Sequence, residues 1–352
     1  MTLQLPAKTE TDEKQIYAAL VKRRVALTAV LLLLAVASCL ANLFIGAVPY
    51  RPSAILQALL GQGDYGFVEI IAWEIRVPVT LVSVVVGAGL SVAGMQMQTV
   101  LNNPLASPFT LGLSAAASFG AALGMVLGTS FLPEALAKFA IPANAFFMAM
   151  LTVLFIERLG RKHAMSTEVV ILLGTTLVFA FTALLQLLQY LAPDTAIAAV
   201  VYWTMGSLDR AGMSEIAFIA AILVFSCVFF VRKAWALTAL RLGEARAVSL
   251  GIPVARLRFQ AIVLSSLLAS ASVAFVGTIG FIGLIGPHIA RMLIGDDQRF
   301  LLPASILCGI ILLSTASVVS KILLPGQSVP IGIVTSIVGV PLFITLILRK
   351  RA

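Results

Sequence analysis

VALTAVLLLLAVASCLANLFI, residues 25–45, contains no charged side chain and directly follows the basic cluster Lys22, Arg23 and Arg24. A helix needs about 20 mainly apolar residues to cross ~30 Å of hydrocarbon, so this run is long enough to span a membrane. A secretory signal would have a shorter apolar core and end in a small-residue cleavage site. We therefore expect a retained membrane-spanning helix behind a cytosolic tail, residues 1–24.

The rest of the chain repeats this pattern. Hydrophobic residues make up 60% of the sequence and charged residues 11%, against about 25% charged residues in a soluble domain. A spanning segment must satisfy its backbone hydrogen bonds internally, so each run is expected to be helical. The sequence predicts an all-α polytopic membrane protein with a ten-span domain over 25–348. The expected spans lie near 25–45, 78–98, 108–128, 140–157, 168–191, 214–231, 259–277, 281–294, 303–320 and 331–348.

The basic residues orient these spans. With both termini inside, nineteen of the 24 Lys and Arg residues fall on inner segments. The other five are Arg51, Arg76, Lys138, Arg210 and Lys321. Because cytoplasmic loops carry an excess of Lys and Arg, both termini, including residues 349–352, are expected in the cytoplasm. The net charge of +9 then reflects topology, and we expect contact with membrane lipid rather than nucleic acid.

The longest inner loop, residues 232–258, mixes apolar and charged residues: RKAWALTALRLGEARAVSLGIPVARLR. This pattern predicts two short surface helices at about 234–255, the second of them closed by Gly251. A long loop with helices of its own suggests a docking platform for a cytosolic partner. A helix lying on the lipid surface explains the pattern equally well at this point.

Several stretches resemble the FecCD family of ABC-transporter permeases, which import iron-siderophores, haem and cobalamin. The resemblance covers nearly the whole chain, and the order of its motifs is specific. The motifs are WEIRVPVTL (73–81), GAGLSVAGMQMQTVLNNPLASPFTLGLSAAASFGAALG (87–124), YWTMGSL (202–208), LRLGEARAVSLGIPV (240–254), GTIGFIGLIGPHIARMLIGDDQRFLLP (277–303) and PIGIVTSIVGVPLFI (330–344).

The resemblance implies a type II ABC importer permease that works as a homodimer or beside a similar subunit. It also implies two cytosolic ABC ATPase subunits and an extracytoplasmic substrate-binding protein as partners. The chain contains no GxxxxGK[ST] phosphate loop. ATP and Mg²⁺ are therefore expected on the partner ATPase, and this chain is expected to bind no cofactor.

Residue roles carried over from the family divide between the two sides of the membrane. On the outer side, the resemblance implies that Arg76 matches a basic position that contacts the binding protein, and that Lys321, before the last span, matches another. The family pattern usually carries a second basic residue where this chain has Val79, and a snorkelling anchor is the alternative for Arg76. On the inner side, the residues expected to contact the ATPase are Leu242, Gly243, Glu244, Ala247, Leu250 and Gly251.

The fifth and tenth spans are implied to line the dimer interface. In the fifth span, Thr182, Gln186 and Gln189 recur at i, i+4 and i+7, and Thr175 lies near the same stripe. The stripe could line a translocation pathway or form hydrogen bonds between helices. Thr167 matches the family's gate region, although Glu168 replaces the small polar residue often found beside it.

No pattern indicates an enzyme or a metal site. The two histidines and three cysteines are widely separated, and catalytic residues are not apparent. Ion-coupled secondary transporters usually carry a charge at mid-membrane, and none lies near the middle of these spans. We therefore prefer import of an iron chelate over secondary transport or membrane-embedded catalysis. Ferric siderophore is the preferred cargo because such systems are the commonest family members, with haem and cobalamin as alternatives.

Overall fold

The computed structural model describes residues 10–62, 66–129, 133–162 and 167–349, and within these ranges it is helical. An isolated bridge between Leu324 and Gln327 is the only strand-like pairing in the described residues. The α-helices are α1 (Glu10–Phe44), α2 (Pro52–Leu59), α3 (Gly66–Ile70), α4 (Val77–Val100), α5 (Leu113–Leu127), α6 (Ala140–Lys162), α7 (Thr167–Leu191), α8 (Asp194–Thr204), α9 (Met213–Arg232), α10 (Ala234–Arg241), α11 (Glu244–Ser249), α12 (Val254–Val276), α13 (Ile282–Ile294), α14 (Gln298–Ile322) and α15 (Ile331–Arg349).

The all-α fold expected from the sequence is confirmed. By length and composition, seven helical segments in the described part of the chain are long and apolar enough to cross a membrane. Three shorter apolar helices, Leu113–Leu127, Ile282–Ile294 and Ile331–Thr345, occupy the expected third, eighth and tenth spans. The structure therefore places an apolar helix at each expected position, but the three short ones leave the count of ten complete spans unconfirmed.

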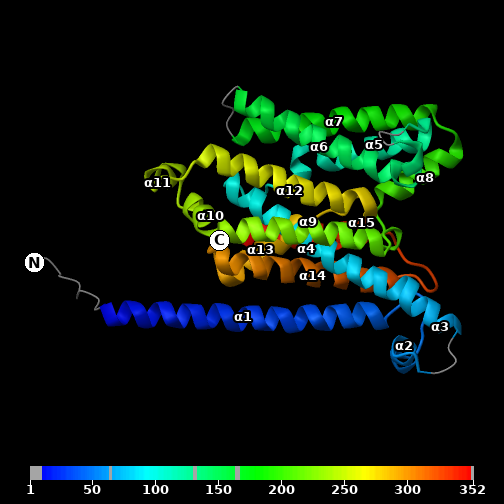
Figure 1. Ribbon diagram of the computed structural model, residues 1–352, viewed down its shortest axis with the longest axis horizontal. Coiled ribbons are helices and arrows are strands. Elements are labelled where there is room, and N and C mark those ends of the chain that lie inside the picture. The colour runs from blue at the N-terminus through cyan, green and yellow to red at the C-terminus, as the bar shows by residue number, and fades with distance from the viewer. Residues whose placement is uncertain (1–9, 63–65, 130–132, 163–166, 350–352) are drawn as a thin grey trace, which may run out of the picture.

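The long helices run side by side and separate two ends of the molecule (Figure 1). One end carries the start of α1, the end of α15, and the short helices α10 and α11. The opposite end carries α2, α3 and α8. We call these the inner and outer ends, after the sides of the membrane that the charge distribution predicts. The start of α1, the end of α15 and the 232–258 loop thus share one end, as an even number of spans would require.

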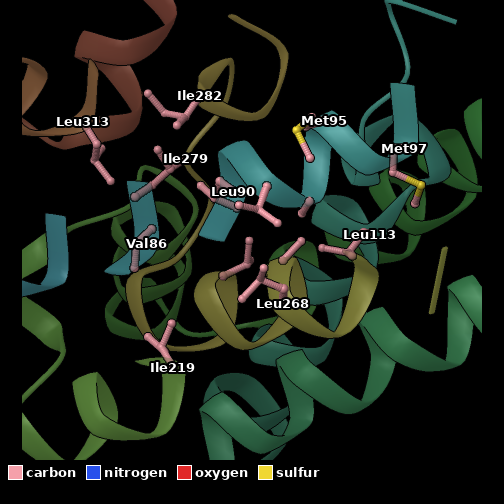
Figure 2. Close-up of a cluster of buried hydrophobic side chains, with 14 of the residues drawn as sticks. Val86, Leu90, Met95, Met97, Leu113, Ile219, Leu268, Ile279, Ile282 and Leu313 are labelled. Atoms are coloured by element: carbon pink, nitrogen blue, oxygen red, sulfur yellow. The ribbon is translucent and has the colours of Figure 1, made fainter. Parts of the chain in front are cut away.

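Helix α4 lies at the centre of the bundle, where it packs against α9, α12, α13 and α14. In Figure 2, Val86 and Leu90 of α4 lie in the same buried apolar cluster as Leu268 of α12. Lipid tails are as apolar as the helices, so there is no hydrophobic drive for the helices to associate, and their association depends on close packing. Small residues provide that packing here, because a Cβ added to Gly94 would lie 1.6 Å from the carbonyl oxygen of Gly283.

Two boundaries differ from the sequence-based expectation. Helix α1 begins at Glu10, so at 1.5 Å per residue its 35 residues extend about 50 Å, well beyond one hydrocarbon thickness. The second span begins early, because α3 and a six-residue π-helix, Ile71–Arg76, lead into α4 without a break. Hydropathy locates the apolar part of each helix and carries no signal for the polar turns that continue it.

Candidate functional site

The inner end carries a surface formed by α10, α11 and the turns after them, which we call the α10–α11 surface (residues 234–253). Leu242, Val248 and Leu250 are 58–68% exposed there, while Ala247 is fully buried. Helix α11 therefore turns Ala247 toward the bundle and Val248 outward, while Leu242 and Leu250 are exposed in the turns on either side of it. Exposed apolar side chains of this kind in one patch are typical of a surface that binds another protein.

Two glycines fix the shape of this surface. Gly243 separates α10 from α11 with a φ of +112°, and Gly251 ends the α11 turn with a φ of +74°. Positive φ values are costly for residues with a Cβ. A Cβ at either position would meet no atom within 4 Å, so backbone conformation rather than space selects glycine. The turn predicted at Gly251 is present.

Polar contacts hold the α10–α11 surface to the bundle on both sides of Gly243. Before it, Arg241 forms an ion pair with Asp296 (Nε–Oδ1, 3.2 Å) and donates from Nη1 to Oδ1 of Asn102 at 2.7 Å. After it, Glu244 pairs with Arg258 of α12 (Oε2–Nη2, 2.9 Å). These contacts connect the surface to α12, to the α4–α5 loop and to the turn between α13 and α14.

At the outer end, Arg76 is buried, with only 3% of its surface exposed. Its guanidinium donates to the carbonyl oxygens of Phe44 (2.6 Å), Val48 (3.0 Å) and Leu43 (3.3 Å). Helix α1 ends at Phe44, so Arg76 provides partners for carbonyls that a helix end leaves unpaired. Contact with a binding protein would require Arg76 to leave these partners, and that role stays a prediction.

Lys321, the second residue expected to contact a binding protein, also binds inside the chain. Its Nζ donates to Asn42 at both the backbone oxygen (2.8 Å) and Oδ1 (2.7 Å). The Asn42 amide donates to Ser83 Oγ (3.1 Å), which lies 3.0 Å from Ser314 Oγ. This chain of contacts ties α1, α4 and α14 together below the outer surface. Asn42 is fully buried, and no local sequence pattern marks it, because its partners are distant along the chain.

Lys321 also borders a cavity of about 600 Å³ at the outer end. The cavity lies between the segment after α8, the end of α14 and the start of α15, with Tyr202 and Ile333 on its wall. Arg210 contributes a charge here and donates to the carbonyl oxygen of Tyr202 at 2.6 Å. Burial lowers the pKa of Arg210 from its ordinary value, but Asp209 opposes this effect. The cavity at the outer end is therefore lined by charged side chains of both signs as well as by apolar ones.

The polar stripe of α7 lies on the surface of the single chain. Thr175, Thr182 and Gln186 are exposed, and Gln189 is half-buried. Thr175 Oγ1 donates back to the carbonyl oxygen of Ile171 at 3.0 Å, a local bond within its own helix. Thr167 is the first residue of α7, and its side chain lies outside the described part of the structure. The stripe is thus free of the bundle packing that covers α4.

Comparison with known proteins identifies the family to which the chain is similar. The model of the FecCD transport family matches residues 32–349. A putative ABC transporter permease of Methanocaldococcus jannaschii is 37% identical, over 96% of this chain and 98% of that protein. The vitamin B12 import permease BtuC of Vibrio cholerae is 34% identical (89% and 91% covered), and the hemin transport permease HmuU of Yersinia pestis is 36% identical (79% and 83%).

Solved structures agree with these relatives. A structure described as an inward-facing putative metal-chelate type ABC transporter matches with a TM-score of 0.80 and 29% identity, covering 92% of this chain and 99% of that chain. PsaBC from Streptococcus pneumoniae matches in fold alone, with a TM-score of 0.54 and 17% identity, covering 80% and 94%. The resemblance inferred from the motifs is confirmed. This integral membrane chain belongs to the FecCD transport family.

Proposed function

We propose that this chain is the transmembrane permease subunit of an ATP-driven ABC importer that carries an iron chelate, with ferric siderophore as the cargo. The cargo would pass from an extracytoplasmic binding protein into the cytoplasm, and both termini of the chain would be cytoplasmic. The family match over residues 32–349 is the observation that carries this proposal. Haem and cobalamin are the alternative cargoes, since relatives named for hemin and for vitamin B12 are similarly identical to this chain.

The complex would contain two permease copies, two cytosolic ATPases that bind ATP and Mg²⁺, and one binding protein. In this assembly the α10–α11 surface would seat in the ATPase. Its support is the set of exposed apolar side chains on and beside α11, together with the two glycines whose positive φ values shape the turns around it. Leu242, Glu244 and Leu250 would make the contact from the exposed side, with Ala247 packed beneath them.

The second permease copy would cover α7. Large apolar side chains on this helix, including Phe179 (72% exposed) and Tyr190 (86%), accompany the polar stripe. On a lipid-facing helix the amide groups of Gln186 and Gln189 would be unfavourable, because they cannot form hydrogen bonds with hydrocarbon. Two α7 helices facing each other would give these amides water or protein partners along a passage.

Iron chelates are preferred as cargo on two grounds. Relatives named as probable iron chelatin permeases in Helicobacter pylori are 36% identical to this chain, over 83% of it. The solved structure with the higher TM-score is described as a putative metal-chelate type transporter. A permease that receives its cargo from a binding protein can leave most of the recognition to that protein, so the three cargoes must be separated by experiment.

The test is ATP-driven uptake into proteoliposomes that contain the permease, its ATPase and its binding protein. Ferric siderophore, haem and cobalamin are offered in parallel, and uptake of ferric siderophore alone is expected. Preference for either other cargo would replace the proposed one. Uptake driven by a proton or sodium gradient without the ATPase would contradict the importer itself and favour a secondary transporter.

A second experiment tests the α10–α11 surface. Gly243→Leu should abolish co-purification of the ATPase while the permease still inserts, because a side chain at φ +112° distorts the turn. Gly128→Leu is a matched control, since this glycine also has a positive φ with no atom within 4 Å but lies after α5. Normal ATPase binding by Gly243→Leu would remove the proposed contact.

A further inference from the structure

Two consecutive aspartates, Asp296 and Asp297, lie in the turn between α13 and α14, after Gly295 with its φ of +92°. Each carboxylate contacts two arginines, and the four arginines come from four different helices. Asp296 holds Arg241 and Arg291, the last residue of α10 and a residue of α13. Asp297 holds the other pair, from α1 and α14. The turn is therefore a junction between four helices at the inner end.

The Asp296 contacts share one atom. Its Oδ1 lies 2.9 Å from Nε of Arg291 and 3.2 Å from Nε of Arg241. The two arginine side chains are largely buried, at 13% and 19% exposure, whereas that of Asp296 is 49% exposed. Two positive groups are thus held on one negative oxygen. Without that oxygen, like charges in a poorly solvated place would repel each other.

This geometry makes Asp296 a charged link between the α10–α11 surface and two helices of the bundle, beside the hydrogen bond from Gln298 N of α14 to Thr238 Oγ1 of α10 (3.1 Å). Arg241 lies two residues before Gly243, so a displacement of α11 reaches Arg241 through one short turn. From Arg241 the contact passes to Asp296, whose backbone joins α13 to α14, and to Asn102 in the α4–α5 loop. Asn102 has a φ of +46°, which fixes an unusual backbone conformation at that contact.

The contact on the other side of Gly243, between Glu244 and Arg258, is more exposed to solvent than the Arg241–Asp296 contact. The Glu244 and Arg258 side chains are 60% and 33% exposed, and ion pairs in water contribute little because solvent screens them. Arg258 donates a further hydrogen bond from Nε to the carbonyl oxygen of Val100 at 3.2 Å. The contact through Arg241 is the better buried of the two routes from the α10–α11 surface into the bundle, so solvent screens its charges less.

We propose that Asp296 is a positioning residue that transmits movement of the α10–α11 surface to α13, α14 and the α4–α5 loop, and so couples ATP hydrolysis to transport. This inference rests on the proposed function, because it assumes that the ATPase binds the α10–α11 surface. Asp296 itself would contact neither cargo nor nucleotide. Its removal should leave both enzymatic turnover by the ATPase and assembly of the complex in place, and break the connection between them.

The experiment measures cargo moved per ATP hydrolysed in proteoliposomes that contain the complete importer. Asp296→Asn keeps the size of the side chain and removes the charge that holds the two arginines together. We expect the ATPase to co-purify in normal amount and hydrolysis to stay within about twofold of wild type. Transport per ATP should fall at least tenfold, a ratio that a general loss of stability would not change.

Asp297→Asn is the matched control, because this neighbouring aspartate binds Arg24 of α1 (3.3 Å) and Arg299 of α14 (2.7 Å) and leaves the Arg241–Asp296 pair in place. Arg299 also lies over the ring of Trp235 in α10 at 5.2 Å, a contact that does not need the charge of Asp297. Transport per ATP should stay near wild type in this variant. An equal loss in Asp297→Asn, or a normal ratio in Asp296→Asn, would overturn the inference. Should Asp296→Asn fail to accumulate in the membrane, Arg241→Gln breaks the same link from α10 and keeps the Asp296–Arg291 pair, and it should show the same loss.

ATPase binding by Gly243→Leu distinguishes a failure of the proposed docking surface from a failure of the inference about Asp296. If the ATPase still binds normally to Gly243→Leu, then the α10–α11 surface is not its seat, whatever Asp296→Asn does. If Gly243→Leu loses the ATPase but Asp296→Asn transports normally per ATP, the docking surface stands and the transmission through Asp296 is wrong.

Discussion

Helices α4 and α7 have nearly the same hydropathy and opposite surroundings. The spanning segments that contain them have mean hydropathies of 2.0 and 2.2, yet 83% of the first window is buried and only 6% of the second. Hydropathy therefore places both helices in a membrane and does not distinguish the centre of the bundle from its edge. What distinguishes them is side-chain size and polarity along each helix.

The centre uses small residues, and the edge keeps large and polar ones. On α4, Gly87 lies against Gly309 of α14 and Gly94 against Gly283 of α13, with backbones so close that a Cβ would overlap a carbonyl group. On α7, Phe179 and Tyr190 point outward together with the polar stripe. We infer that α4 is a fixed axis of the single chain, whereas α7 is completed by a partner.

The largest expected effect comes from filling a contact on α4. In Gly94→Leu the new Cβ would lie 1.6 Å from Gly283 O, and no rotamer change can relieve a clash with backbone. We expect a loss of at least about 3 kcal/mol in stability, seen as little folded protein in detergent. Gly66→Ala is the control, since its Cβ would meet nothing within 4 Å. A stable, monodisperse Gly94→Leu protein would show that α4 is not a fixed axis.

Arg76, in the π-helix before α4, gives the next largest effect. Arg76→Gln removes most of the hydrogen bonds to the carbonyls at the end of α1 and should cost about 2 kcal/mol, measured as a lower thermal midpoint of the permease alone. Binding-protein affinity, measured at low salt with folded protein, tests the docking role separately. A normal thermal midpoint with weakened docking would support docking and remove the structural role.

The sequence alone predicts features that depend on neighbouring residues. The positions of the apolar helices, and of the two short helices in 232–258, follow from apolar runs and from the Gly and Pro residues that end helices. The partners of Arg76, Lys321 and Asp296 do not, because each contact joins segments that are distant in sequence. A buried arginine that pairs with backbone carbonyls looks the same in a single sequence as an arginine exposed at the membrane surface.

On α7 we expect an effect on transport without an effect on folding. Gln186 is exposed, so Gln186→Leu should change stability by less than about 0.5 kcal/mol. If the stripe lines a passage or pairs with a second copy, uptake should fall several-fold. Thr176→Val is the control, because Thr176 is an exposed residue of α7 that lies off the stripe. Unchanged uptake in Gln186→Leu would indicate that α7 faces lipid rather than a passage or a second copy.

The smallest effect concerns α1. Like α7 this helix is largely exposed, with 17% of its apolar segment buried, but the ion pair between Arg24 and Asp297 holds its inner part. Asp297 binds Arg24 of α1, and the hydrogen bond from the Arg299 guanidinium is the main cause that holds the pKa of Asp297 below its usual range. A lowered pKa in the folded state means that Asp297 stabilises the fold above the unfolded pKa of about 3.9, and that this contribution is lost as pH falls through the folded value.

Wild type should therefore have a higher thermal midpoint than Asp297→Asn at pH 7, and the difference should shrink toward zero as the pH is lowered below about 4. Glu69→Gln, at an exposed acid of α3, controls for the loss of one negative charge. A difference that stayed constant across this range would mean that the Asp297 charge does not anchor α1. The inner part of α1 would then be held by its packing against α14 and α13, while its outer part keeps the hydrogen bonds from Arg76 and Lys321.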